Sequence, residues 1–415
     1  MNDLGRLEDL PADYVQDMRR QNLVPLWPSL RAVLPPHLPA RQTQPTHWAY
    51  QTIKPLLLRA GELTPIEKAE RRVLVLANPG HGLDKMQASA AMYLGMQLLL
   101  PGEWAPSHRH TPNAVRMVVE GKGAWTTVEG EKCPMERGDL ILTPTGLWHE
   151  HGHDGTDPVI WLDVLDLPLM YYAEVSYHVN GPRQQVLPGQ GDRRHAHGGL
   201  LPTPMFERGQ QAYPMLRYPW AQARAALLAM AADDPGQEHV QITYVNPETG
   251  DDAENILGFY ALMLRPGQSL QLPARSPAQV FHVIEGSATV EVATATPARC
   301  RARTGARGRS GVLSSRRRPN SQRLVVGRPT TASSSAAIRS ASRRCGSGGS
   351  NPMLLAWLQV IATGGRPCSN SSTRVRRPWA GALEASSTCR STPQVRSAAS
   401  CSRARRAARS ARWRG

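Results

Sequence analysis

Two closely spaced histidine pairs are the residues of this sequence best suited to chemistry. One residue separates His108 from His110, and 39 residues after His110 comes His149, followed by His151. Residues two apart on a β-strand project from the same face, so histidines from two neighbouring strands can converge. Neutral imidazole nitrogens are good ligands for transition metals. We therefore predict a metal site at His108, His110 and His149, against the alternative of an isolated surface or core pair.

The glycines and prolines around these histidines form a recognisable pattern. Gly102-x5-His108-x-His110 with a later Gly121 resembles the first cupin motif, and Gly138-x5-Pro144-x-Gly146-x2-His149 resembles the second. Ala114 or Val115 stands where the first motif usually has a glutamate ligand. Three neutral histidines suit Fe(II), Zn, Cu or Ni and leave coordination positions open, where Fe(II) could take a substrate and O₂ side by side. The alternative is a degenerate cupin without metal.

Short strands must position these histidines. Apolar runs separated by glycine and proline turns predict strands over 91–100, 114–120, 124–128, 139–143 and 159–165. Short strands at this spacing are typical of a small antiparallel barrel or sandwich. Helices are predicted from Thr64 and Pro65, as cap and first turn, and over 218–232, which is rich in Ala and Leu.

A second β region repeats the first. Strand-like runs over 258–265, 280–285 and 288–292 follow the same order, and 19 residues separate a Pro-Gly from a Glu-Gly in both regions. This spacing indicates an internal duplication. Pro273 and Arg275 occupy the positions that match His108 and His110, and His282 is out of register, so it is interpreted as a strand histidine. We expect the second barrel to hold no metal.

These patterns predict an all-β core with added helices, built as a tandem cupin (a double-stranded β-helix barrel) whose second copy is truncated. The expected order is an N-terminal helical and loop arm over 1–85, the metal-binding cupin over 86–180, a linker and helix over 181–235, a partial second cupin over 236–293, and an Arg/Ser-rich segment over 294–415 that we expect to be disordered.

The last segment has an unusual composition. Residues 294–415 contain 25 arginines, no lysine and one acidic residue, Glu384, whereas residues 1–293 carry 24 basic and 32 acidic residues. A GC-rich gene that is read out of frame produces such a bias, so we hypothesise a frameshift near residue 293. The alternative is a disordered basic arm that binds nucleic acid or a membrane.

Charge and composition exclude several classes for the acidic part. The overall charge of +16 comes from the last segment, so it does not indicate a nucleic-acid binder. We expect no signal peptide and no membrane span, and hence a cytoplasmic protein. Cys133 is the only cysteine before residue 294, which argues against a disulfide framework. His195 and His197 lie in a glycine-rich linker and are interpreted as a solvated loop pair.

The chain closely resembles the gentisate 1,2-dioxygenase family, which includes salicylate and 1-hydroxy-2-naphthoate dioxygenases. The resemblance covers roughly residues 10–293. It rests on four stretches: Pro101-Gly-Glu-Trp-Ala-Pro-Ser-His-Arg-His110, Val118-Val-Glu-Gly-Lys-Gly-Ala-Trp125, Trp148-His-Glu-His-Gly152 and Trp161-Leu-Asp163.

The resemblance implies Fe(II) at the three histidines and a pocket for a small aromatic hydroxy acid beside the O₂ site. The residues matching the family's pocket are Arg72, Tyr93, Gln97 and Arg116 for substrate binding, with His151 and Asp163 as catalytic residues. His151 would contact the substrate hydroxyl as hydrogen-bond partner or base, and Asp163 would orient a histidine. Tyr93 matches a pocket aromatic that varies with substrate.

The implied reaction is the cleavage of gentisate by O₂ to maleylpyruvate, in the catabolism of aromatic compounds, by a homotetramer. Salicylate or 1-hydroxy-2-naphthoate remain alternative substrates. Two other classes stay open, a non-catalytic cupin that binds an aromatic acid or a sugar, and a defective gene product. In the last case the second cupin would stop after about three strands, with open edges and low activity.

Overall fold

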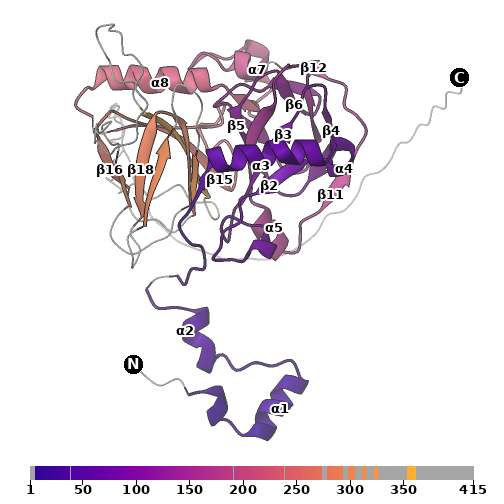
Figure 1. The fold of residues 1–415 in the computed structure, drawn as a ribbon, viewed down its shortest axis with the longest axis vertical. Coiled ribbons are helices and arrows are strands. Elements are labelled where there is room, and N and C mark those ends of the chain that lie inside the picture. Colours follow the sequence, from indigo (N-terminus) through magenta and orange to yellow (C-terminus); the bar gives the residue numbers. More distant parts are fainter. Residues whose placement is uncertain are drawn as a thin grey trace, which may run out of the picture. The chain divides into compact units, whose positions relative to one another are not determined.

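The computed structural model describes residues 5–37, 39–189, 191–237, 239–272, 278–292, 298–303, 311–314, 322–325 and 353–360. Two β-rich halves follow each other along the chain, with helices added to them (Figure 1). The predicted fold class, a tandem cupin with an all-β core and added helices, is confirmed. Among the described residues, no helix is long and apolar enough to cross a membrane.

The added helices are short except for two. Helix α3 buries Tyr50, Ile53 and Leu57, which recur at helical spacing and so form one apolar stripe. The helices are α1 (Ala12–Arg20), α2 (Leu30–Val33), α3 (Tyr50–Leu63), α4 (Ile66–Ala69), α5 (Leu167–Tyr172), α6 (Gly191–Arg194), α7 (Thr203–Glu207) and α8 (Trp220–Asp233). Helix α8 confirms the predicted helix over 218–232. Helix α4 begins directly after Pro65, as predicted, but its N-cap is Pro65, because Thr64 is the C-cap of α3.

Two six-stranded sheets form the first half. One has the order β13-β8-β5-β10-β3-β2 and the other β11-β4-β9-β6-β7-β12. The strands of the first sheet are β2 (Arg72–Val75), β3 (Tyr93–Leu99), β5 (Ala114–Glu120), β8 (Leu140–Thr143), β10 (Val159–Leu165) and β13 (Arg217–Tyr218). Those of the second are β4 (Trp104–His110), β6 (Ala124–Val128), β7 (Glu131–Pro134), β9 (His149–His153), β11 (His178–Asn180) and β12 (Leu187–Pro188).

The first sheet buries both of its faces, and alternate residues serve different cores. Leu94, Met96 and Leu98 of β3 face outward and pack with the apolar stripe of α3, which crosses β2 and β3 (Figure 1). Leu99 of β3 and Trp161 of β10 instead help to fill the barrel. Because side chains alternate across a strand, the odd-numbered positions of β3 and β10 face the barrel interior.

The second half repeats this strand order. Its sheets run β1-β20-β17-β22-β15-β14 and β16-β21-β18-β19, so β15, β22 and β17 are adjacent as β3, β10 and β5 are. The strands are β1 (Thr46–Ala49), β14 (Val240–Thr243), β15 (Leu257–Leu264), β16 (Ser269–Leu272), β17 (Gln279–Glu285), β18 (Ser287–Val292), β19 (Ala298–Arg303), β20 (Gly311–Ser314), β21 (Gln322–Val325) and β22 (Met353–Val360).

Four of these strands come from beyond residue 293. The sequence predicted a second cupin truncated near there, and the defective-product alternative added open strand edges. In the structure, β19 to β22 pair with all four of β15 to β18, so these edges are covered. An open strand edge pairs readily with any segment that can extend, and β22 (Met-Leu-Leu-Ala-Trp-Leu-Gln-Val) is strongly apolar. The boundary at residue 293 and the frameshift stay predictions.

Candidate metal centre

The three predicted ligands converge. His108 and His110 lie on β4, and His149 begins β9 directly opposite His108. One ligand atom from each of the three imidazoles lies within 4.8 Å of the others, and the ring centroids of His108 and His149 are 4.0 Å apart. The two strands are neighbours in one sheet, so the i, i+2 spacing of His108 and His110 turns both rings toward His149.

Backbone carbonyls orient all three rings in the same way. The Nδ1 atoms of His108, His110 and His149 lie 3.0, 2.7 and 3.0 Å from the carbonyl oxygens of Pro106, Pro112 and Leu147. A carbonyl can only accept, so each Nδ1 carries the hydrogen and each Nε2 keeps its lone pair. The buried Nε2 of His149 has no hydrogen-bond partner in the described part of the chain. This arrangement fits a metal ion, which would use those lone pairs.

Electrostatics keep these imidazoles neutral. Burial, followed by the charge of Arg71, lowers the pKa of His108 to about 2. Burial likewise lowers the pKa of His110 to about 4, and that of His149 falls well below its usual value for the same first cause. A neutral imidazole is the form that binds a metal, so the site is ready for a cation at physiological pH.

An ion pair lies on the inner face of the first sheet, beside the histidines. Arg116 of β5 is opposite Asp163 of β10, with 3.3 Å between Arg116 Nε and Asp163 Oδ1. Arg116 also donates to Thr143 Oγ1, and Asp163 accepts from Trp161 Nε1 at 3.0 Å. Burial raises the pKa of Asp163 to about 6, although the charge of Arg116 and the bond from Trp161 oppose the rise. Both partners of this pair were predicted from the sequence as site residues.

Two further predicted residues offer unused polar atoms to this interior. His151 is fully buried, and its Nδ1 lies 3.0 Å from Thr126 Oγ1 while its Nε2 has no partner within the described ranges. Its ring centroid lies 6.2 Å from that of His149. Burial, then the charge of Arg116, lowers the pKa of His151 well below its usual value. Gln97 is buried on the inner face, and its Nε2 also has no hydrogen-bond partner in the described part of the chain.

Tyr93 begins β3 on the same inner face, opposite Leu165. Its ring covers Gly95, since a side chain at Gly95 would meet the Tyr93 hydroxyl at 2.8 Å. Burial and the nearby charge of Asp163 raise the pKa of Tyr93, so its hydroxyl stays protonated. The residue therefore supplies an aromatic wall and a hydrogen-bond donor.

Arg72 is the one predicted site residue that the structure does not bring to the histidines. It lies opposite Leu98 on the outer face of the sheet and forms a buried ion pair with Glu103, which also accepts from the backbone N–H of Leu100. Consecutive residues project to opposite sides of an extended chain. The neighbouring Arg71 therefore points the other way, where its charge lowers the pKa of His108 and of His151.

His178 joins Arg71 at the edge of the site and was not predicted. Its Nε2 lies 3.3 Å from Arg71 Nη2, and its ring centroid lies 5.3 Å from that of His108. β11, which carries it, pairs with β4 and places His178 opposite His110. In sequence it is an isolated histidine 29 residues after His149, so only the strand pairing identifies it.

Other residues considered from sequence lie away from this centre. Cys133 is buried and unbridged. His282 is buried on β17, whereas Pro273 and Arg275 lie outside the described residues. The side chain of His195 is only 1% exposed and lies 3.4 Å from Glu248, so it is not the solvated loop residue that we expected. The polar contacts of the linker, which the sequence pattern could not show, bury it.

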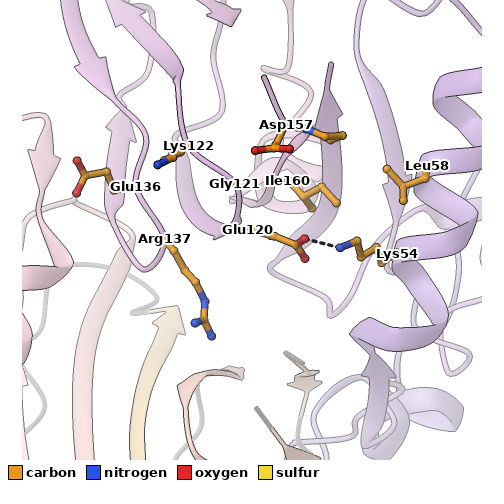
Figure 2. Close-up of a pocket in the computed structure, with 10 residues that line it drawn as sticks. Lys54, Leu58, Glu120, Gly121, Lys122, Glu136, Arg137, Asp157 and Ile160 are labelled. Atoms are coloured by element: carbon orange, nitrogen blue, oxygen red, sulfur yellow. Dashed lines mark hydrogen bonds and ion pairs between the residues drawn. The ribbon is translucent and has the colours of Figure 1, made fainter. Parts of the chain in front are cut away.

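The first half also contains a groove, and none of the predicted site residues lines it. It lies beside α3, where the Glu120 carboxylate faces the Lys54 ammonium group (Figure 2). Arg137 extends from it (Figure 2). Its guanidinium group donates to the carbonyl oxygen of Ile284 in the second half. Because Lys54 and Glu120 neutralise each other and no histidine lines the groove, the histidine cluster is the stronger candidate site.

Comparisons with known proteins agree with this geometry. The cupin domain family matches residues 95–165. A gentisate 1,2-dioxygenase from Ralstonia sp is 76% identical over 295 residues, which cover 71% of this chain and 83% of that protein. The gentisate 1,2 dioxygenase 1 of Aquipseudomonas alcaligenes is 35% identical over 286 residues, 68% of this chain and 81% of that protein.

Solved structures give the same result. The salicylate 1,2-dioxygenase from Pseudaminobacter salicylatoxidans superposes with a TM-score of 0.70 at 31% identity, covering 85% of this chain and 94% of that one. The identity and coverage of these relatives, together with the three converging histidines, lead to one conclusion. The chain belongs to the gentisate 1,2-dioxygenase family of cupin ring-cleaving dioxygenases.

Proposed function

We propose that this protein uses Fe(II) and O₂ to cleave the ring of gentisate, between the carboxyl-bearing carbon and the adjacent hydroxyl-bearing carbon, to give maleylpyruvate. The observation that carries the proposal is the convergence of three neutral, carbonyl-oriented histidines beside a buried arginine and a buried histidine, whose Nε2 has no hydrogen-bond partner among the described residues. The 76% identity to the Ralstonia gentisate 1,2-dioxygenase supports the choice of substrate.

The Nε2 atoms of His108, His110 and His149 would hold the iron. Three neutral nitrogen donors suit Fe(II) and leave coordination positions for other ligands. When bound, the metal would supply Lewis-acid and redox chemistry toward the aromatic ring and O₂. Binding and orienting the substrate would fall to side chains of this protein.

Two arginines would bind the substrate carboxylate. Arg116 is buried beside the histidines, and Arg71 lies at the edge of the site with one quarter of its side chain exposed. A guanidinium group donates charge-assisted hydrogen bonds to a carboxylate, which fixes both position and charge. We assign Arg71 the binding role that the family resemblance implied for Arg72, because Arg72 is engaged with Glu103 on the other face.

His151 would accept a hydrogen bond from the substrate hydroxyl. If its Nδ1–H donates to Thr126 Oγ1, the lone pair of Nε2 is free inside the site. The imidazole is neutral there, so its lone pair can accept a hydrogen bond from the substrate hydroxyl and orient it.

Asp163, Gln97 and Tyr93 would shape the pocket. Asp163 holds Arg116 through its carboxylate and is itself fixed by Trp161, so we assign it a positioning role. Gln97 and Tyr93 offer donors from the same inner face. These groups select for an aromatic ring that carries oxygen substituents beside its carboxylate.

The test is O₂ uptake by the Fe(II)-loaded protein with gentisate, salicylate and 1-hydroxy-2-naphthoate in parallel, with His108→Ala as the control variant. We expect gentisate to be consumed fastest, with a ring-cleaved product, and the variant to be inactive. Full activity of His108→Ala would overturn the metal assignment, and faster turnover of salicylate would overturn the substrate assignment.

A further inference from the structure

A buried hydrogen-bonded cluster lies directly behind the metal centre. Asn113, in the turn between β4 and β5, donates its backbone N–H to Asp166 Oδ1 and its Nδ2–H to Asp166 Oδ2, each at 2.9 Å. Its Oδ1 accepts from the backbone N–H of Thr145 at 2.9 Å. Asn113 is 3% exposed and Asp166 is 0% exposed. One amide side chain thus joins three loops, those that follow β4, β8 and β10.

Two of these loops carry the carbonyl groups that orient metal ligands. The loop after β4 contains Pro112, whose carbonyl oxygen accepts from His110 Nδ1 at 2.7 Å. The loop after β8 contains Leu147, whose carbonyl oxygen accepts from His149 Nδ1 at 3.0 Å. The same two loops meet again where the backbone N–H of Gly146 donates to the carbonyl oxygen of His110 at 2.9 Å. The orientation of two ligands therefore depends on how these loops are held.

We infer that Asn113 and Asp166 are positioning residues for the metal, which set the directions of His110 and His149 through the Pro112 and Leu147 carbonyls. The inference rests on the proposed function insofar as the histidines bind a metal. Groups that orient ligating histidines affect metal affinity by roughly 10- to 100-fold. The Asn113–Asp166 clamp holds the loops that carry the orienting carbonyls and does not touch the histidines themselves. Its loss should therefore weaken metal binding by about 10-fold, at the lower end of this range.

The two residues can be exchanged without losing a hydrogen bond. In the double variant Asn113→Asp/Asp166→Asn, the backbone N–H of residue 113 still meets an oxygen of residue 166. The amide of residue 166 then donates to the carboxylate of residue 113, which still accepts from Thr145 N–H. Each single variant loses the hydrogen bond between the two side chains. In Asp166→Asn an N–H donor faces another N–H donor, and in Asn113→Asp a carboxylate oxygen faces another carboxylate oxygen.

A matched control is available at the opposite end of β8. Asp139 is 2% exposed and accepts from Trp220 N–H at 2.8 Å and from Arg217. Asp139→Asn removes a comparable buried carboxylate without touching the loops of the metal centre. It should lower the melting temperature and leave metal affinity unchanged.

The experiment titrates the metal-free proteins with Fe(II) under anaerobic conditions and with Co(II) as a spectroscopic probe, and records the melting temperature of each metal-free protein. We expect about 10-fold weaker binding and an altered Co(II) spectrum for both single variants. The exchanged double variant should regain wild-type affinity. Single variants with wild-type affinity and spectrum, or an Asp139→Asn variant that loses affinity equally, would overturn the clamp alone. Wild-type protein that binds neither ion would overturn the metal centre as well.

Discussion

The two halves of the molecule share one strand order but differ in what their barrels contain. The equal spacing from Pro-Gly to Glu-Gly aligns β5 with β17 and β3 with β15, so Arg116 corresponds to Phe281 and Gln97 to Leu262. All four side chains are buried. The same positions hold polar groups in the first half and apolar groups in the second. The apolar filling of the second half shows that the cupin barrel does not need polar groups at these positions, so the polar groups of the first half are best explained by chemistry.

Polar filling has a physical cost that apolar filling avoids. Removing a charged group from water costs several kcal/mol, which a well-placed partner can roughly offset. Arg116 has such partners in Asp163 and Thr143, whereas Phe281 needs none. The alignment also explains the histidine of the second half. His282 corresponds to Met117, which faces the outer core, so it lies on the wrong side of its strand for a ligand.

The largest expected effect tests whether metal binding belongs to the first half alone. His149→Ala should abolish stoichiometric Fe(II) binding and lower turnover of gentisate by more than ~100-fold, because it removes a ligand rather than a group behind one. His282→Ala, the matched buried histidine of the second half, should retain its metal. Elemental analysis of the folded fractions checks both. Equal metal loss in the two variants would break the comparison.

The next effect concerns the polar filling itself. Arg116→Met should lower kcat/KM for gentisate by about 100-fold, because a charge-assisted bond to the substrate carboxylate is lost and Asp163 is left unpaired. Arg137→Met removes an arginine that contacts the second half and should leave kcat/KM near wild type. Steady-state O₂ uptake measures the difference in kcat/KM. If kcat/KM fell by a similar factor in both variants, the cause would be lost stability and not lost substrate contact.

Two neighbouring arginines provide a finer test within the first half. Arg71→Ala should raise KM for gentisate about 10-fold while metal content stays constant, since it loses one charge-assisted bond at the edge of the site. Arg72→Ala should instead destabilise the fold by about 3 kcal/mol, because it leaves Glu103 without its partner, and should keep KM. Urea unfolding and steady-state kinetics separate the two. The reverse pattern would restore Arg72 as the substrate residue.

The smallest effect is a pH dependence at the contact between the halves. Burial and the charge of Asp166 raise the pKa of Glu254 to about 7. Because this pKa is higher in the folded than in the unfolded chain, Glu254 stabilises the fold at low pH, and that contribution is lost as the pH rises through 7. From pH 5 to pH 8, the free energy of unfolding of wild type should fall by about 2 kcal/mol relative to that of Glu254→Gln.

A carboxylate with the opposite shift is the control for that measurement. At Glu248, burial is outweighed by hydrogen bonds from Arg208, and its pKa is lowered. Between pH 5 and pH 8, the free energy of unfolding of Glu248→Gln should therefore not rise relative to that of wild type. Urea unfolding at several pH values gives both slopes, and equal slopes for wild type and Glu254→Gln would contradict the assignment of Glu254.

Much of the site could be predicted because local spacing carries its information. The His-x-His pair, the later His149 and the turn glycines define strand positions within short segments, and strands β5, β6 and β10 begin and end where the apolar runs predicted. Arg116 and Asp163 were found separately, yet their pairing depends on the register of β5 against β10, which no local pattern shows.

The sequence alone determined the candidate metal ligands, the duplication and the family resemblance, since each depends on residue types at fixed spacing. Tertiary structure decided which of two adjacent arginines faces the site, because a shift of one residue at the start of β2 reverses the direction of every side chain. It also decided that His178 lies at the edge of the metal centre and that Asn113 pairs with Asp166 behind it, because residues far apart in sequence become neighbours only when strands and loops pack. Those contacts are long-range, and long-range packing is a property of the folded chain.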